Sequence, residues 1–447
     1  MKAPIEWPAD LRSSVLIEAF LLVLMVDRIS FPAESASVLG VGSLFAAVVG
    51  LLLRNPIAAF AAFALDAANL INHLPEVANH LTVLILVDIA LLVLLARSGG
   101  SKRAPVALRY GLILLYLTAG FHKLNSSYTD ISVSCARFIT DRTLTWFALP
   151  PSGDLLATVN VWLGVLIEFT IPVLLVVRRT RWLGLLTGLI FHGLLALTPI
   201  GGVASFSMFI VALYVVFFDT ETLRRINQWR SLLPDGVLRA ATRGIGPVIA
   251  ATVVTAAVTT ANVFAPGGPT LAARFSVFLL ICLLLAVFVH GHPWVRREPV
   301  EWRPTPGAAL VSLYIMVAAS LPYLGGRTQL AFSMFSNLRT EVAPNHDLNR
   351  GDHLFGYQDD LVTIPESPHR DFDDISGPDL VVPAYEVGRR LDHLDSTITS
   401  LTVRSDGVTK TLRGDEITAR FEAPSFIESR LIRMRATETD GPVSCRH

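Results

Sequence analysis

The stretch RYGLILLYLTAGFHKLNSSY, residues 109–128, decides how the rest of the chain is interpreted. Its apolar, helix-forming run leads directly into His122 and Lys123. An ionisable group at the edge of a hydrocarbon layer is costly, so it suggests a function. Arginine takes almost every other basic position in this chain. Because a desolvated lysine can act as a free amine base and arginine cannot, Lys123 is a candidate for proton transfer, the alternative being a lysine that extends towards lipid headgroups.

Composition places the whole chain in the same class. The 447 residues are 52% hydrophobic and 17% charged, and apolar runs of about 20 residues recur. These features predict an all-α polytopic membrane bundle of about nine to eleven transmembrane helices, with the lipid bilayer as its partner. The net charge of zero gives no indication of a nucleic-acid partner. The candidate spans are 13–31, 37–54, 56–73, 77–97, 105–124, 155–177, 182–198, 201–219, 245–264, 271–290 and 306–324.

The distribution of basic residues predicts an orientation, because cytoplasmic loops collect lysine and arginine. The connections after the third and seventh spans carry no basic residue. We therefore expect a plasma-membrane protein with a cytoplasmic amino terminus, a retained first helix and an extracytoplasmic carboxyl-terminal domain. Basic residues follow the second, fourth, sixth, eighth and tenth spans: Arg54; Arg97, Lys102 and Arg103; Arg178, Arg179 and Arg181; Arg224, Arg225 and Arg230; Arg296, Arg297 and Arg303.

Two external parts follow from this orientation. The connection 124–154 is too long for a simple link, which predicts a lid or a wall of a binding site. The composition changes after the last span, and residues 331–447 hold 33 of the 74 formal charges. We therefore divide the chain into a transmembrane domain, 1–330, and a small external α+β domain, 331–447. In the latter we expect a hairpin, 397–412, and short helices at 383–394 and 425–435.

Three cysteines do not form a disulfide framework. Cys135 and Cys445 could pair if both face an oxidising compartment. Two unpaired thiols are the favoured interpretation.

Polar side chains inside apolar spans cost energy in lipid and usually face a cavity or one another. For Asp66, Asp88 and His192 we favour interhelical hydrogen bonding, while Glu168 fits a structural or a functional role equally. Sequence signatures of soluble enzymes, such as a phosphate-binding loop, are absent. We predict no metal site, because no carboxylate or thiolate spacing supports metal binding by His80, His122 and His192.

Three segments carry a resemblance to a known family. Tyr116-Leu117-Thr118-Ala119-Gly120-Phe121-His122-Lys123-Leu124 resembles the Tyr-x-x-Ala-Gly-x-x-Lys-Leu segment of vitamin K-dependent γ-glutamyl carboxylase and of the HTTM (horizontally transferred transmembrane) proteins that share its membrane region. Asn79-His80 resembles the Asn-His at the start of a span in that family. Phe332 to Asn337 resembles the segment after its final spans, and Gln358 to Val362 is similar to prokaryotic members.

The resemblance implies a reaction and the residues that perform it. Lys123 would be the general base that deprotonates vitamin K hydroquinone or another quinol, and His80 would assist by hydrogen bonding. With O2 and CO2 as co-substrates, the product would be a carboxylated peptidyl glutamate, its peptide held by the external domain. The polar residues expected around the quinol are Asn79, His122, Glu168 and His192.

The chain also departs from the carboxylase. The external region of about 120 residues is much shorter, and His122 stands where the carboxylase has a second lysine. The residues themselves leave two other functions open: a different quinone- or lipid-linked membrane enzyme, and a non-catalytic transporter or scaffold whose polar groups line a path.

Overall fold

The computed structural model describes residues 5–31, 37–96, 103–228, 268–291, 299–349, 353–394, 398–405 and 407–445. Within these residues the chain is mostly helical, and its few strands all follow residue 360. The predicted span 245–264 lies outside the described residues. The other ten predicted spans coincide with helices: α1 (Leu11–Ser30), α3 (Val38–Leu53), α4 (Pro56–Asn72), α5 (Asn79–Ala96), α6 (Arg103–His122), α9 (Asp154–Val176), α10 (Arg181–Ala196), α11 (Val203–Tyr214), α15 (Gly268–Gly291) and α16 (Pro306–Ser320).

Side-chain caps explain where several of these helices begin. The Asp10 carboxylate accepts a hydrogen bond from the Ser13 amide at the start of α1. Asn55 and Thr305 cap α4 and α16, and each precedes a proline in the first turn. A cap satisfies amides that have no partner within the helix, and proline has no amide to satisfy there.

Among the residues that the structure describes, four helices are long and apolar enough to cross a membrane: Asn79–Ala96, Arg103–His122, Asp154–Val176 and Pro306–Leu324. The last one includes a 3-10 turn, η3 (Leu321–Leu324). The apolar helices Val38–Leu53, Pro56–Asn72, Arg181–Ala196 and Val203–Phe217 are shorter. That any of these helices crosses a membrane stays a prediction.

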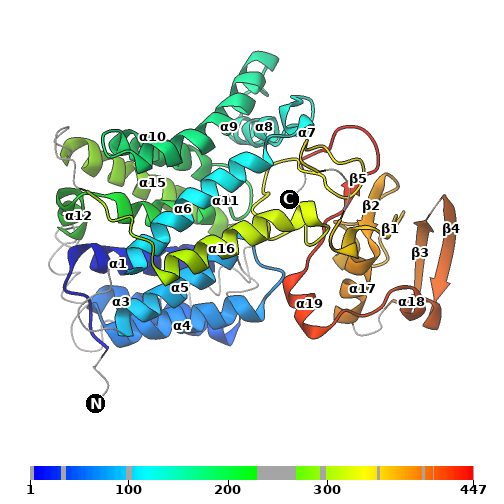
Figure 1. Cartoon of the computed structure of the whole chain (residues 1–447), viewed down its shortest axis with the longest axis horizontal. Coiled ribbons are helices and arrows are strands. Elements are labelled where there is room, and N and C mark those ends of the chain that lie inside the picture. Colours follow the sequence, from blue (N-terminus) through cyan, green and yellow to red (C-terminus); the bar gives the residue numbers. More distant parts are fainter. Residues whose placement is uncertain are drawn as a thin grey trace.

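The helices pack into one bundle (Figure 1). Helix α3 packs on α4, α6 on α16, and α9 on both α6 and α10. One continuous hydrophobic core runs from Val15 in α1 to Phe332, just beyond α16. The expected span 105–124 ends as a helix at His122, so Lys123 occupies the turn that follows α6.

The predicted external loop contains two further helices, α7 (Ser126–Thr129) and α8 (Cys135–Trp146). Another short helix, α12 (Thr220–Asn227), lies outside this loop and follows α11 and the 3-10 turn η1 (Val215–Phe217). Figure 1 shows α7 and α8 near the end of the bundle that carries the carboxyl-terminal region.

The carboxyl-terminal region has its own hydrophobic core, built from residues between Val362 and Ala436. Strands β1 (Leu361–Val362), β2 (Leu380–Pro383) and β5 (Thr437–Glu438) form an antiparallel sheet with β2 in the centre. The predicted hairpin is confirmed as β3 (Ser400–Ser405) and β4 (Val408–Arg413), paired in register from Ser400–Arg413 to Ser405–Val408. The region also contains η4 (Gly356–Gln358), η5 (Arg370–Phe372), α17 (Ala384–His393), α18 (Asp415–Arg420) and α19 (Phe426–Leu431). The predicted helix 425–435 is therefore shorter than expected.

The favoured interpretation of two unpaired thiols is wrong. Cys135, at the start of α8, and Cys445 form a disulfide, with their Cα atoms 4.8 Å apart. The sequence left this pair open as the alternative, but the 310 residues between the two cysteines gave no sign that the fold brings them together. It joins the end of the chain covalently to the 124–154 connection.

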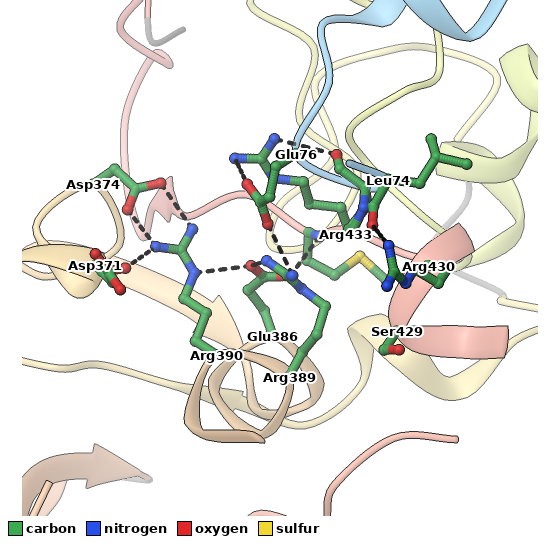
Figure 2. Close-up of polar contacts among 12 residues, drawn as sticks. Leu74, Glu76, Asp371, Asp374, Glu386, Arg389, Arg390, Ser429, Arg430 and Arg433 are labelled. Carbon is green, nitrogen blue, oxygen red and sulfur yellow. Dashed lines mark hydrogen bonds and ion pairs between the residues drawn. The ribbon is translucent and has the colours of Figure 1, made fainter. Parts of the chain in front are cut away.

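An ionic cluster connects the carboxyl-terminal region to the bundle (Figure 2). Glu76, in the connection between α4 and α5, pairs with Arg389 at 2.9 Å and with Arg433 at 2.8 Å. Arg389 also pairs with Glu386, which is fully buried. Arg430 of α19 donates a hydrogen bond to the Leu74 carbonyl. These contacts place the strands and α17 against one end of the bundle.

Candidate functional site

A cavity of about 540 Å³ lies between α6, α8, α9, α10 and α11 and the start of α5. This volume is within the range of small-molecule sites, which are mostly apolar with a few converging polar groups. Phe332, Met334 and Phe335 close one side of the cavity. Its polar lining residues are Asn79, His80, Tyr116, Lys123, Tyr128, Thr140, Thr143, Asn160, Glu168, Thr187, His192 and Thr198.

Lys123 and Glu168 form an ion pair in the wall of this cavity. The Lys123 ammonium donates to both carboxylate oxygens of Glu168, at 2.8 and 2.9 Å. Lys123 is only 8% exposed, so the pair lies out of bulk water. These two are the hydrogen bonds that Lys123 makes with described side chains, although an ammonium has three donors. The third donor is available for a molecule in the cavity.

A glycine permits this pairing. A Cβ atom on Gly120 would lie 3.1 Å from the Phe169 ring and 3.2 Å from the Glu168 Cβ. Gly120 therefore allows α6 and α9 to approach closely three residues before Lys123. The backbone then leaves the helix through a tight turn, in which the Lys123 amide donates to the Gly120 carbonyl at 3.1 Å.

Tyr128 covers the ion pair from α7. Its ring lies 5.8 Å from the Lys123 nitrogen, a cation–π distance. Its hydroxyl lies against Gly164, where an added Cβ would be only 2.5 Å away. Burial raises the pKa of Tyr128 and the charge of Glu168 raises it further, so the phenol stays protonated beside the pair.

Asn79 and His80, the first residues of α5, line the same cavity. His80 Nε2 lies 2.9 Å from the Ser205 hydroxyl of α11. His80 Nδ1 and Asn79 Oδ1 are buried, and neither has a hydrogen-bond partner among the described residues. The expected partnership of Lys123 with His80 is not a direct hydrogen bond, since each has another partner and the two share only the cavity wall.

His192 lines the cavity from α10 and also joins helices, as the sequence predicted. Its Nε2 atom lies 2.7 Å from the Tyr116 hydroxyl of α6, and Tyr116 in turn contacts the Tyr214 hydroxyl of α11. The Nδ1 atom of His192 has no partner among the described residues. Asp66 pairs with Arg28 of α1 at 2.7 Å, away from the lining residues.

His122 is not among the lining residues, contrary to its expected contact with a quinol. Its Nδ1 atom bonds the Tyr323 hydroxyl at 2.8 Å, and its Nε2 atom bonds the Ala331 carbonyl at 3.0 Å. These two partners hold the imidazole against Tyr323 and the segment after α16, while the Lys123 side chain extends from the following turn to Glu168 in the cavity wall. In the part of the chain that the structure describes, no three metal-ligating side chains cluster, and His80, His122 and His192 have separate partners.

The long connection contributes to the site as predicted, since Ala136, Ile139 and Thr143 of α8 line the cavity. Another part of the wall is a segment whose backbone is strained. Left-handed φ angles are costly for residues other than glycine, and this segment has four of them. The four residues are Leu330, Phe332, Phe335 and Asn337.

The Asn337 side chain holds that segment in place. Its amide oxygen accepts from the Cys135 amide at 2.8 Å, and its amide nitrogen donates to the Val443 carbonyl at 2.8 Å. Asn125 holds it from the other side, because it donates to the Ser336 carbonyl at 2.6 Å. The wall of the cavity is thus fixed by α8 and by the end of the chain.

Sequence reasoning did not identify Tyr116, Tyr128 or Ser205 as site residues. Both tyrosines belong to the stretch quoted first, and Tyr116 lies seven residues before Lys123, two helical turns away, so its spacing was a usable signal. No sequence signal marked Ser205, because its position is defined only by the packing of α11 on α1 and α5.

Comparison with known proteins gives no match: no protein-family model, curated protein or solved structure is significantly similar to this chain. The resemblance to the carboxylase family therefore depends on the short segments quoted above. Its consequences enter below as proposals.

Proposed function

We propose that the chain is an integral membrane enzyme that binds a lipid-soluble quinol in the cavity and removes a proton from it. One observation carries this proposal. A Lys123–Glu168 ion pair lies in the wall of a largely apolar cavity of about 540 Å³, shielded from bulk water. Buried ionisable groups in a cavity of a membrane bundle are the usual marks of a functional site.

The ion pair supports a specific proton transfer. Moving one proton from the Lys123 nitrogen to Glu168, across 2.8 Å, leaves an amine beside a neutral acid. A poorly solvated site reduces the preference for the charged form of the pair. The amine then accepts the proton of a quinol hydroxyl, which gives an ammonium and a quinolate anion side by side. Lys123 is the base in this proposal, and Glu168 takes up its proton.

The specific version is the carboxylase reaction. The resemblance implies that the quinolate reacts with O2 to give a strong base, which deprotonates peptidyl glutamate before CO2 adds. The carboxyl-terminal region, which borders the cavity through Phe332 to Phe335, is the part available to hold a peptide.

We also propose that the helices span the plasma membrane, with the carboxyl-terminal region outside. The Cys135–Cys445 disulfide supports this orientation, because disulfides persist in oxidising compartments. In a Cys282→Ser background, an impermeant maleimide applied to intact cells should label Cys445 only after reduction, while Cys135 is buried. Labelling that requires cell lysis would contradict the orientation.

The test of the reaction is turnover of a panel of naphthoquinols and benzoquinols by protein in lipid nanodiscs. Lys123→Ala should reduce turnover at least ~100-fold, because it removes the general base. Lys410→Ala is the matched control: Lys410 pairs with Glu416 at 3.1 Å on the exposed hairpin, and its loss should leave turnover unchanged. Normal turnover by Lys123→Ala, or no quinol turnover by the unmodified protein, would contradict the proposal.

A further inference from the structure

Helix α19 of the carboxyl-terminal region presents an apolar face to its surroundings. Phe426 is 76% exposed, and Ile427 and Leu431 are exposed as well. A helix turns about 100° per residue, so these three side chains lie on one face. A capping box between Ser425 and Glu428 fixes the start of the helix, so the face is already formed in the folded protein. Exposed apolar faces of this kind mark contacts with another protein or with a membrane.

The position of α19 favours the membrane. Figure 1 shows the helix beside the end of the bundle. Arg430 donates a hydrogen bond to the carbonyl of Asn72, the last residue of α4, and another to the Leu74 carbonyl at 3.2 Å. Ile71, in the last turn of α4, is also exposed. The apolar face of α19 therefore begins where the exposed apolar surface of the bundle ends.

A second apolar group lies at the end of α16. Leu354 and Phe355 are exposed, and the Phe355 amide donates to the carbonyl of Leu324, the last residue of η3, at 2.8 Å. Tyr357 connects this group to α19, because its ring lies 6.5 Å from the Phe355 ring and its hydroxyl donates to Glu428 at 2.8 Å. We call the two groups together the apolar rim: Leu354, Phe355, Phe426, Ile427 and Leu431.

The charges on α19 fit the boundary between lipid headgroups and acyl chains. The Arg430 guanidinium lies 5.5 Å from the Phe426 ring. Aromatic rings and arginines are both favoured at this boundary, because the ring reaches the apolar layer while the guanidinium stays among the phosphates. The Glu428 carboxylate is held by the Tyr357 hydroxyl and the Ser425 amide. Helix α19 thus presents apolar side chains and a cation, while protein groups bind its carboxylate.

We propose that the apolar rim inserts into the outer surface of the lipid bilayer, so that the carboxyl-terminal region rests on the membrane. The inference depends on the proposed membrane orientation. Amphipathic segments of this kind are buried about 5–10 Å into the boundary between headgroups and acyl chains. Because the rim borders the ends of both α4 and α16, two separate contacts with lipid fix the tilt of the region relative to the bilayer.

Spin labelling of the full chain in phosphatidylcholine nanodiscs tests the insertion. Phe426→Cys is labelled in a Cys282→Ser background, where Cys135 and Cys445 remain paired. Oxygen concentrates in the acyl chains and a nickel chelate stays in water, so the ratio of their effects on the label reports its surroundings. We expect the label at position 426 to be more accessible to oxygen than to nickel. Ile427→Cys gives a second reading of the same face.

Val408→Cys is the matched control. Val408 is apolar and 69% exposed, but it lies on the hairpin of β3 and β4, away from the bundle in Figure 1. Its label should be more accessible to nickel than to oxygen. The same nickel preference at positions 426 and 427 would overturn the inference. Labels there that neither reagent reaches would also overturn it, because a protein partner or a second copy would then cover the face.

Leu313→Cys separates this inference from the proposed membrane span. Leu313 lies in the middle of α16 and is exposed. Its label should be more accessible to oxygen than to nickel. Nickel access at position 313 would contradict the membrane span, and the apolar rim with it. Oxygen access at position 313 together with nickel access at position 426 would overturn the apolar rim alone.

Discussion

Two buried ionic groups, one in the bundle and one in the carboxyl-terminal region, differ in how completely protein atoms satisfy them. Glu386 accepts four hydrogen bonds: two from Arg389, one from Arg390 and one from the Met434 amide, at 2.6–3.0 Å. The Lys123–Glu168 pair has a single partner on each side and faces a cavity. A saturated cluster has no capacity for a ligand, whereas the cavity pair has a donor to spare.

The difference separates a structural cluster from the pair for which we propose a chemical role. The Glu386 cluster connects α17 to Glu76 in the bundle, so its role is to position the carboxyl-terminal region (Figure 2). Around the cavity, the polar atoms without partners are Asn79 Oδ1, His80 Nδ1 and His192 Nδ1, among the residues that the structure describes. These three atoms are themselves buried, so the group left available to a ligand is the third donor of the Lys123 ammonium.

The largest effect on stability is expected at Glu386. Glu386→Gln leaves the buried guanidinium groups of Arg389 and Arg390 without their shared anion, which should destabilise the protein by ~3–5 kcal/mol. Thermal unfolding in nanodiscs measures the loss. Glu416→Gln, in an exposed pair with Lys410, should show no change. Equal melting temperatures for Glu386→Gln and the unmodified protein would contradict the structural role that we assign to Glu386.

The complementary substitution is Glu168→Gln. It keeps the shape of the side chain but cannot take up the Lys123 proton, so quinol turnover should fall ~10–100-fold. Because the cavity can admit water to the unpaired ammonium, the melting temperature should fall less than in Glu386→Gln. If Glu168→Gln lost much of its stability but none of its turnover, the Lys123–Glu168 pair would be structural, like the Glu386 cluster.

Gly120→Ala tests the approach of α6 and α9. The added Cβ would meet Phe169 at 3.1 Å, so the helices must separate by a few tenths of an ångström. We expect a loss of turnover of up to ~10-fold, because small misplacements of reacting groups are costly. Gly307→Ala is the control, since its nearest neighbour is 3.8 Å away. Full turnover in Gly120→Ala would show that the pair tolerates a wider gap.

The smallest effect is expected at Asp374, at the edge of the Glu386 cluster. Burial acts to raise the pKa of Asp374, but the hydrogen bonds and charge of Arg390 outweigh it, so the pKa lies below its ordinary value. A lowered pKa stabilises the fold above the unfolded value of about 4, and the contribution is lost as pH falls below it.

Asp374 is 58% exposed, so this contribution is under about 1 kcal/mol after screening by solvent. The difference in melting temperature between the unmodified protein and Asp374→Asn should be present at pH 6 and shrink at pH 3. A difference that grows as the pH falls would contradict this sign.

Sequence patterns predicted the parts of the molecule that depend on local periodicity. Apolar runs located the helices, and alternation around Ser405–Gly407 located the hairpin. Lys123 was identified as a site residue because it interrupts an apolar run. Its pairing with Glu168 was not, because the contact needs Gly120 to bring two helices together and has no trace in spacing.

Long-range contacts account for the remaining differences. The disulfide spans 310 residues, and the position of Ser205 depends on three helices. His122 does not line the cavity because Tyr323 and the Ala331 carbonyl, about 200 residues away in the sequence, bind both of its ring nitrogens. Such contacts are properties of tertiary packing, so a single sequence could not specify them.

The most direct measurement of the difference between the two clusters is quinol turnover per folded molecule in Lys123→Arg. Arginine keeps the charge and can still pair with Glu168, but it cannot become a free base. We predict a melting temperature close to that of the unmodified protein and turnover lower by at least ~100-fold. Turnover at the normal rate in the folded variant would show that the cavity pair is structural, as the Glu386 cluster is.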